Sequence, residues 1–230
     1  MPNWVYNSLT ITGDEKTIAE FKELASKPYN TYYEDFMTKQ QVEKQHEGAI
    51  QFWNFIEPEN KEAYFGASDY KPEGYDEMST EEKMAISMQF KSDGWYDWNI
   101  RNWGTKWDAS DPCLGADNPT NLQYSFSTAW SPAEGAYRAM VEKFPTLTFE
   151  FYCEEEQGWG VEFVGKDGEM EVSNEWDIPE SHADYKARDN EDGCACAQGW
   201  DYEDWYDDCP DNPKKTEEAV QAFEDISELI

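Results

Sequence analysis

The sequence predicts an α+β fold in which a β-α-β-β-α-β core forms an antiparallel sheet with both helices on one face. The N-terminal stretch alternates apolar and polar residues and leads into a helix. After residue 100 the pattern gives two strands, a helix and further strands. We expect a single domain, residues 1–230, whose parts are a ferredoxin-like core at 3–27 and 101–176, an insertion at 28–100, and an acidic, aromatic-rich extension at 177–230.

The first strand and helix have clear local signals. Residues 4–12 place apolar side chains on one face at the two-residue spacing of a strand. Asp14 is a favourable N-cap for a helix that runs to about residue 26, where apolar positions recur at helical spacing. This stretch therefore predicts a strand, a turn and a helix.

The insertion is polar and rich in tyrosine. It holds one helical candidate at 33–46 and a stronger one at 79–91. The second begins with Ser79 three residues before Glu82, which is the pattern of a capping box. We expect these helices to be joined by loops.

The second half of the core has a regular pattern. Asp111-Pro112 and Asn118-Pro119 indicate loops. The order of predicted elements is a short strand, a strand, a helix and three strands, at 102–109, 122–130, 132–144, 147–153, 159–165 and 169–176. The extension is expected to end in an amphipathic helix at 216–228.

The formal charge of −32 excludes some classes of partner. Phosphate contacts need clustered Lys and Arg, so we expect no direct binding to nucleic acid and none to anionic membranes. The charge is uneven, with 11 basic and 22 acidic side chains in residues 1–120 against 7 and 28 in 121–230. The first residues lack the pattern of a secretory signal and no apolar run is long enough to span a membrane, so we expect a cytoplasmic protein of the host cell with reduced thiols.

Two stretches resemble a known family. MPNWVYNSLTITG at 1–13, and NWGTKWDA at 102–109 followed by FSTAWSP at 126–132, resemble the YubB-type proteins of plasmids and phages. The resemblance implies a ferredoxin-like fold, which here means the topology and not an iron–sulfur protein. It implies no particular reaction, and it favours an origin on a mobile element with a role in host takeover or counter-defence.

The cysteines leave one metal site open. Cys194, Cys196, Cys209 and His182 could together supply four ligands, although structural zinc sites commonly use a C-x2-C pair and this chain has C-x-C. An acidic segment near residue 190 resembles a calcium-binding loop but lacks ligands at its first and last positions. We expect no cofactor and no bound metal, and the metal binding of the three cysteines stays open.

Catalytic patterns are weak. The chain has only two histidines, His46 and His182, and it has no glycine-rich phosphate loop. Paired carboxylates occur by chance in a chain with 50 acidic residues. We therefore expect no enzyme, with a metal-dependent enzyme as the alternative.

Four tryptophans cluster between residues 95 and 107. They could form a platform on which a ligand stacks, or they could be buried rings that hold the insertion on the sheet. The second interpretation is favoured because the core is poor in aliphatic residues. The four are Trp95, Trp98, Trp103 and Trp107.

The acidic residues suggest the function. Residues 151–213 hold 20 carboxylates but only three basic side chains, and rings lie among the acids, as in WDYEDWYDDCPD at 200–211. Trp and Tyr are typical anchors of protein interfaces. We therefore expect a non-enzymatic inhibitor from a phage or plasmid that mimics nucleic acid and blocks the basic groove of a host or defence protein. The candidate partner-binding residues are Glu154, Glu155, Glu156, Glu169, Glu171, Asp201, Glu203, Asp204, Trp205, Asp207 and Asp208.

An alternative keeps the acids out of the interface. In that case the chain is a protein–protein interaction module recognised by shape and apolar contacts, and its charge serves only solubility. Neutralising the acids together would separate the two hypotheses.

Overall fold

The computed structural model describes residues 2–35, 37–38, 40–66 and 71–178, together with 181, 183 and 209. The chain divides into two compact units, Met1–Trp176 and Asp177–Ile230. A single domain was expected, and the boundary between the two units falls where the acidic extension was expected to begin. The elements below all belong to the first unit.

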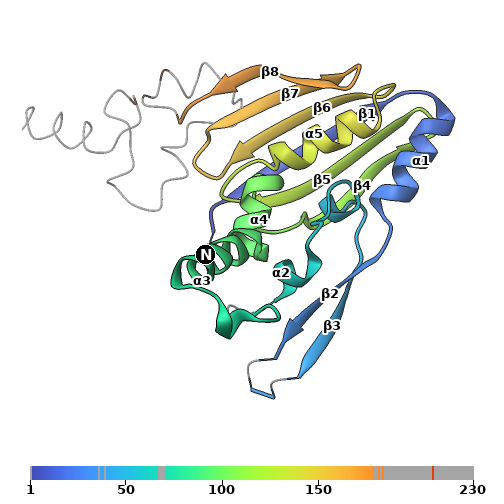
Figure 1. Ribbon diagram of the computed structural model, residues 1–230. Helices are drawn as coiled ribbons and strands as arrows, with labels where there is room; N and C mark the ends of the chain where they lie inside the picture. The colour runs from blue at the N-terminus through green and yellow to red at the C-terminus, as the bar shows by residue number, and fades with distance from the viewer. Residues whose placement is uncertain are drawn as a thin grey trace, which may run out of the picture. The chain divides into compact units, whose positions relative to one another are not determined.

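A six-stranded sheet forms the centre of the first unit (Figure 1). Its strands are β1 (Trp4–Thr12), β4 (Ser110–Asn118), β5 (Asn121–Ala129), β6 (Thr148–Glu155), β7 (Gly160–Lys166) and β8 (Glu169–Trp176). They lie in the order β4-β5-β1-β6-β7-β8, and every neighbouring pair is antiparallel. Two helices, α1 (Glu15–Ala25) and α5 (Glu134–Lys143), lie on the same face of this sheet.

This arrangement confirms the predicted ferredoxin-like fold. In chain order the core is β1-α1-β4-β5-α5-β6, with β1 between the two strands that follow each other around α5. The strands β7 and β8 extend the sheet beyond β6. Asp14 caps α1 as expected, because its carboxylate accepts a hydrogen bond from the Thr17 amide.

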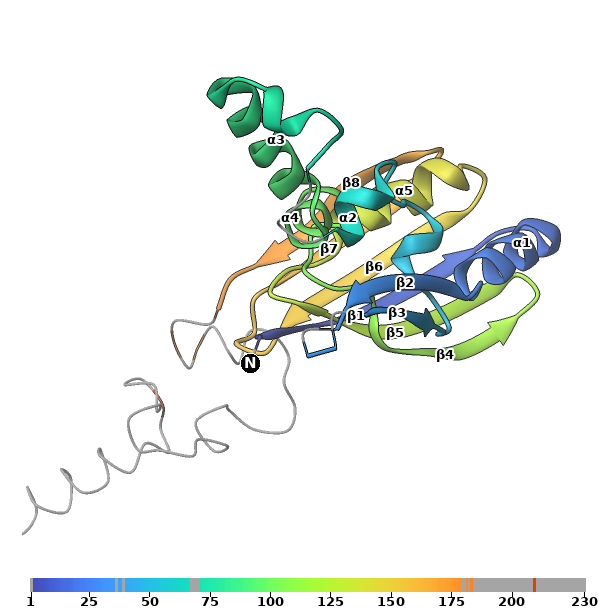
Figure 2. The ribbon, with the colours of Figure 1, turned by 60° about the horizontal axis from the view of Figure 1, so that its bottom comes forward.

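The insertion forms a small hairpin and several helices. Its elements are β2 (Tyr29–Glu34), β3 (Gln41–His46), η1 (Phe52–Asn54), α2 (Lys61–Phe65), η2 (Tyr75–Glu77), α3 (Thr80–Asp93) and α4 (Trp95–Asn102). The capping box at the start of α3 is present as predicted, with both hydrogen bonds between Ser79 and Glu82. Figure 2 shows α3 standing away from the sheet, which agrees with the finding that α3 buries none of its residues.

The helix predicted at 33–46 is wrong, because this stretch belongs to the antiparallel β2–β3 hairpin. Residues 29–33 read YNTYY, and aromatic and β-branched side chains favour strands. The apolar partners of the hairpin come from elsewhere in the chain: Tyr29 stacks on Trp53 with ring centroids 4.9 Å apart. Local spacing could not reveal that contact.

Two predictions near residue 105 also need correction. The segment 102–109 contains the end of α4 and an irregular stretch, not a strand, because Thr105 uses its side chain to close the end of β5. Its Oγ1 donates to the Ala129 carbonyl and accepts from the Ala129 amide. Asp111-Pro112 lies inside β4 rather than in a loop, since a register shift on this edge strand accommodates the missing proline N–H.

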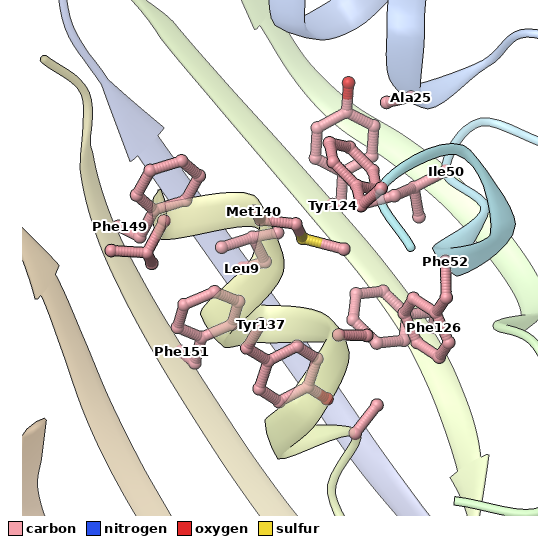
Figure 3. Packing of buried hydrophobic residues seen from close by; sticks show 14 of the residues in the cluster. Leu9, Ala25, Ile50, Phe52, Tyr124, Phe126, Tyr137, Met140, Phe149 and Phe151 are labelled. Atoms are coloured by element: carbon pink, nitrogen blue, oxygen red, sulfur yellow. The ribbon is translucent and has the colours of Figure 1, made fainter. Parts of the chain in front are cut away.

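Aromatic rings make up much of the core between the sheet and its helices (Figure 3). Tyr137 of α5 stacks on Phe151 of β6 with ring centroids 4.3 Å apart. Phe21 of α1 contacts Phe149 edge-on at 5.8 Å. Large rings bury much apolar area per residue, which compensates for the shortage of Leu, Ile and Val.

One buried polar cluster fixes the core. Asn7 in β1 is almost fully buried, and its Oδ1 accepts a hydrogen bond from the Tyr137 hydroxyl at 2.7 Å. Its Nδ2 donates to the Val5 carbonyl at 2.8 Å and lies 3.1 Å from Thr128 Oγ1 in β5. The cluster therefore ties β1, β5 and α5 together at one point.

Removing the Tyr137 hydroxyl should destabilise the fold. In Tyr137→Phe the buried Asn7 Oδ1 loses its donor, and we expect the free energy of unfolding to fall by about 1–3 kcal/mol. Urea unfolding followed by circular dichroism measures this loss. Tyr6→Phe is the matched control, since Tyr6 is 55% exposed, and an equal loss in both variants would contradict the role given to Asn7.

Candidate functional site

The face of the sheet opposite α1 and α5 is open in the first unit. Along β1 and β6, buried side chains alternate with side chains that reach this face. On β4, β5 and β1 the open face carries mainly small polar side chains, such as Ser8, Thr10, Gln123 and Ser125. On β6, β7 and β8 the open face carries several glutamates.

We use the name acidic face for the part of this surface that carries five carboxylates. They are Glu150, Glu154, Glu162, Glu169 and Glu171. Within the described part of the chain, none of the five forms an ion pair with Lys or Arg. Lys166 lies directly opposite Glu169 on the paired strands β7 and β8, so the negative charge is partly offset at that end of the face.

The pairing of the strands fixes where these carboxylates stand. Val164 on β7 lies between Glu150 on β6 and Glu171 on β8. Neighbouring strands are about 4.8 Å apart, so the backbones of these two glutamates are about 10 Å apart. Glu162 lies opposite Tyr152, one step further along the strands. The pairing of the strands therefore fixes the backbone positions of these glutamates relative to one another.

Aromatic rings lie among the acids. Tyr152 contacts Trp176 with ring centroids 5.4 Å apart, and its hydroxyl donates to Glu154 Oε2 at 2.5 Å. The indole of Trp176 can lie over β7 because residue 160 is a glycine: a Cβ there would come within 2.3 Å of the ring. A shallow hollow of about 330 Å³ lies beside these rings, and its lining includes Ser8, Thr10, Glu150, Tyr152, Glu162 and Ser173.

Four of the sequence-predicted partner residues are accessible. Glu154, Glu169 and Glu171 belong to the acidic face, and Glu156 is exposed just after β6. Three of these four glutamates therefore share one patch on the sheet, and their role in binding a partner stays a prediction.

Glu155 does not belong with them and corrects the expectation. It is only 3% exposed, and its Oε2 accepts a hydrogen bond from the Gln157 amide at 2.7 Å. Strand alternation turns its side chain to the helix-covered side, where it closes the turn between β6 and β7. Its carboxylate stabilises the turn between β6 and β7 and is not accessible to a partner.

The other six predicted partner residues lie outside the described residues. They are Asp201, Glu203, Asp204, Trp205, Asp207 and Asp208. Three members of the open metal set, Cys194, Cys196 and His182, also lie outside, while Cys209 is buried and is not in a disulfide. Among the described residues, no group of three or more His, Cys, Asp or Glu side chains is placed to hold a metal ion.

Sequence reasoning missed Glu150 and Glu162. The signal was present, because an inward-facing Phe149 and Phe151 require Glu150 between them to point to the opposite face. For Glu162 the same rule applies next to the buried Phe163. The prediction was based on runs of acids near the C-terminus and did not include single acids within strands.

The tryptophans near residue 100 divide into two pairs. Trp98 and Trp103 are buried, as expected for rings that hold the insertion on the sheet. Trp95 and Trp107 are 43% and 37% exposed and line a cavity of about 620 Å³. We call this cavity the aromatic cleft; its walls come from the β2–β3 hairpin, α2, the α4 region and the start of β4.

Asp108 organises the base of the aromatic cleft. Its buried carboxylate accepts hydrogen bonds from the Phe52 amide at 2.6 Å, the Tyr29 hydroxyl at 2.8 Å and the Ala109 amide at 2.7 Å. The Trp53 amide lies 3.3 Å away and donates as well. Burial raises the pKa of Asp108, and these hydrogen bonds act in the opposite direction. One carboxylate therefore joins the hairpin, η1 and β4.

His46 closes one side of the aromatic cleft. Its ring stacks on Tyr29 with centroids 4.7 Å apart, and its Nε2 lies 2.8 Å from Thr31 Oγ1. Burial lowers the pKa of His46, and the neighbouring Lys44 lowers it further. Both effects favour the neutral imidazole.

Two comparisons with known proteins found a similarity, and the family model supports the ferredoxin-like fold. A family model described as "Ferredoxin-like domain in Api92-like protein" matches residues 102–197. The crystal structure of Api92 from Yersinia pseudotuberculosis is similar at 12% identity, covering 78% of this chain and 99% of that chain with a TM-score of 0.45. No curated protein matches the chain.

Residues 102–197 are therefore similar to an Api92-like ferredoxin-like domain, over less than half of the chain. The more specific resemblance to YubB-type proteins gains no support from these comparisons. In the described part of the chain, no helix has the length and apolar character needed to cross a bilayer.

Replacing the Asp108 carboxylate should loosen the insertion. In Asp108→Asn the amide nitrogen cannot accept a hydrogen bond, so at least one buried donor among Phe52, Trp53 and Tyr29 loses its partner. We expect the free energy of unfolding to fall by about 1–3 kcal/mol in a urea titration. Asp76→Asn on the surface is the control, and an Asp108→Asn variant as stable as the wild type would disprove the role of this carboxylate.

His46 should make stability depend on pH. A group whose pKa is lowered in the folded state stabilises the fold above its unfolded pKa, which is about 6.5 for histidine, and this stabilisation is lost as the pH falls below that value. His46→Gln should therefore lose less stability than the wild type between neutral and mildly acidic pH. Thermal melts of both proteins over this range measure the difference, and parallel pH curves would count against it.

Proposed function

We propose that this chain is a non-enzymatic acidic inhibitor that binds a basic, nucleic-acid-binding protein of a host or its defence system. The acidic face is the part of the described structure that would meet the partner. Occupying the basic groove of that protein would displace its DNA or RNA. This proposal needs no cofactor.

The single observation that carries the proposal is the set of carboxylates on the open face of the sheet that form no ion pair with Lys or Arg of the described residues. Such carboxylates are available to Lys and Arg side chains of a partner, and the sheet fixes the backbone from which each glutamate extends. Tyr152 and Trp176 lie among them and offer the ring surface that interfaces favour.

The spacing of the acids limits how closely nucleic acid is copied. Duplex DNA has about one negative charge per 1.7 Å of its axis. Carboxylates about 10 Å apart across the strands are sparser than phosphates. The proposed mimicry therefore rests on the sign and fixed position of the charge, reinforced by rings, and not on a phosphate-by-phosphate match.

The second candidate is an interaction module that uses shape alone. It is favoured by the hollow beside Tyr152 and Trp176, which could receive an apolar side chain whatever the charge around it. The two candidates differ in what happens when charge is removed without changing shape.

Four Glu→Gln changes on the acidic face should abolish most binding. The face variant changes Glu150, Glu154, Glu162 and Glu171, and a control variant changes Glu59, Glu73, Glu77 and Glu81, which are exposed and lie outside the sheet. Both variants lose four negative charges, so only the position of the charge differs. Proteins captured at low salt from a bacterial lysate are identified, purified and titrated with each variant.

The inhibitor model expects the face variant to bind at least about tenfold more weakly, and the control variant to bind like the wild type. It also expects the captured protein to release a labelled oligonucleotide when the wild type is added. Equal losses in both variants would show that only net charge matters. Full retention by the face variant would favour the interaction module, and a third variant with Asp201, Asp204, Asp207 and Asp208 changed to Asn tests the extension.

A further inference from the structure

The aromatic cleft differs in chemistry from the rest of this acidic protein. Among the described residues that line it, Asp108 is the sole carboxylate, and its oxygens are occupied by four donors from the protein. It therefore has little capacity to hold a cation. The same lining includes Lys44 and His46.

Two lysines at the cleft have no acidic partner in the described part of the chain. Lys44 lines the cavity, and Lys106 holds its Nζ 4.5 Å from the centre of the Trp107 ring and 5.6 Å from that of Tyr96. Neither lysine forms an ion pair there.

Lys44 belongs to the described lining, whereas Lys106 contacts the lining residue Trp107 without lining the cavity itself. Glu43 accepts a hydrogen bond from the Tyr32 hydroxyl next to the same wall. With one lysine and one fully hydrogen-bonded carboxylate in the described lining, the cleft is less acidic than the chain as a whole.

The walls of the cleft offer ring faces on both sides. The hairpin contributes Tyr32 and Tyr33, and the opposite side contributes Trp95 and Trp107, all of them partly exposed. Deeper in the insertion, Tyr29 lies between His46 and Trp53, and the three rings are nearly parallel, with interplanar angles of 7° and 3°. Side chains arranged in this way already stack planar groups within the protein.

We propose that the aromatic cleft binds a small planar heteroaromatic ligand that carries a negative charge, of which a nucleoside monophosphate is the simplest case. Its ring would stack on Trp95 or Trp107, and its phosphate would meet the ammonium group of Lys44, which is the lysine of the described lining. Any nucleobase could stack on an aromatic side chain at such a site, because every base has a π-face. The cavity volume of about 620 Å³ is in the range of small-ligand sites.

The charge of the whole protein would restrict the ligand to small anions. A polynucleotide would bring many phosphates close to a chain of formal charge −32, whereas a mononucleotide brings only one. The site lies on the insertion and shares no residue with the acidic face. It can therefore be present whether or not the acidic face binds a basic protein.

Calorimetric titration of the full chain with adenosine 5′-monophosphate tests this proposal, with adenosine and glucose as comparison ligands. We expect the monophosphate to bind and adenosine to bind about tenfold more weakly, since it lacks the charge that Lys44 meets. Trp107→Ala and Lys44→Gln should each weaken binding of the monophosphate about tenfold. Trp130→Ala and Lys83→Gln change an exposed tryptophan and a lysine outside the cleft, and both should leave binding unchanged.

Three results would overturn the proposal. The first is no binding of the monophosphate to the wild type. The second is an affinity for adenosine or glucose equal to that for the monophosphate, which would show that the negative charge of the ligand does not contribute to binding. The third is binding that survives both cleft variants. Circular dichroism shows whether Trp107→Ala is folded. If it is not, the affinities of Lys44→Gln and Trp107→Phe for the monophosphate are compared instead. Trp107→Phe should keep most of the affinity because it keeps a ring.

Discussion

Packing of both core helices on one face of the sheet is the constraint on which the rest of this structure depends. Rings from α1 and α5 fill that side, with Tyr137 stacked on Phe151 and bonded to Asn7. The opposite face then needs no apolar side chains, and strand alternation assigns it the polar ones. A ring-rich core on one side thus allows a charged surface on the other.

This division explains how an acidic chain can stay folded and still present charge. Repulsion among carboxylates opposes compaction, but burial of large aromatic side chains supplies the opposing free energy. The acids of β6, β7 and β8 lie on strands of the main sheet instead of on loops. A partner would therefore meet glutamates whose backbone positions are already fixed, so that only their side chains are ordered on binding.

The sequence was sufficient for most of the core but not for β4 or the insertion. The other strands and the two helices of the core have regular spacing and local caps, such as Asp14, so their limits could be predicted within a few residues, whereas β4 lies at 110–118 and was predicted at 102–109. The β2–β3 hairpin depends on Tyr29 stacking with Trp53, and the irregular stretch before β4 depends on Thr105 and Asp108. These are contacts between distant parts of the chain, which local patterns do not contain. In the candidate site, the alternation of side chains along β6 could have identified Glu150 as exposed and Glu155 as buried. The prediction instead selected acids that are adjacent in the sequence.

The central claim is that a basic partner sits on the acidic face. Chemical labelling of carboxyl groups, read by mass spectrometry for the free chain and for its complex with the captured partner, tests it most directly. The account predicts that Glu150, Glu162 and Glu171 lose reactivity in the complex, while Glu59, Glu73, Glu77 and Glu81 keep theirs. Unchanged labelling of the three sheet glutamates in a saturated complex would contradict it.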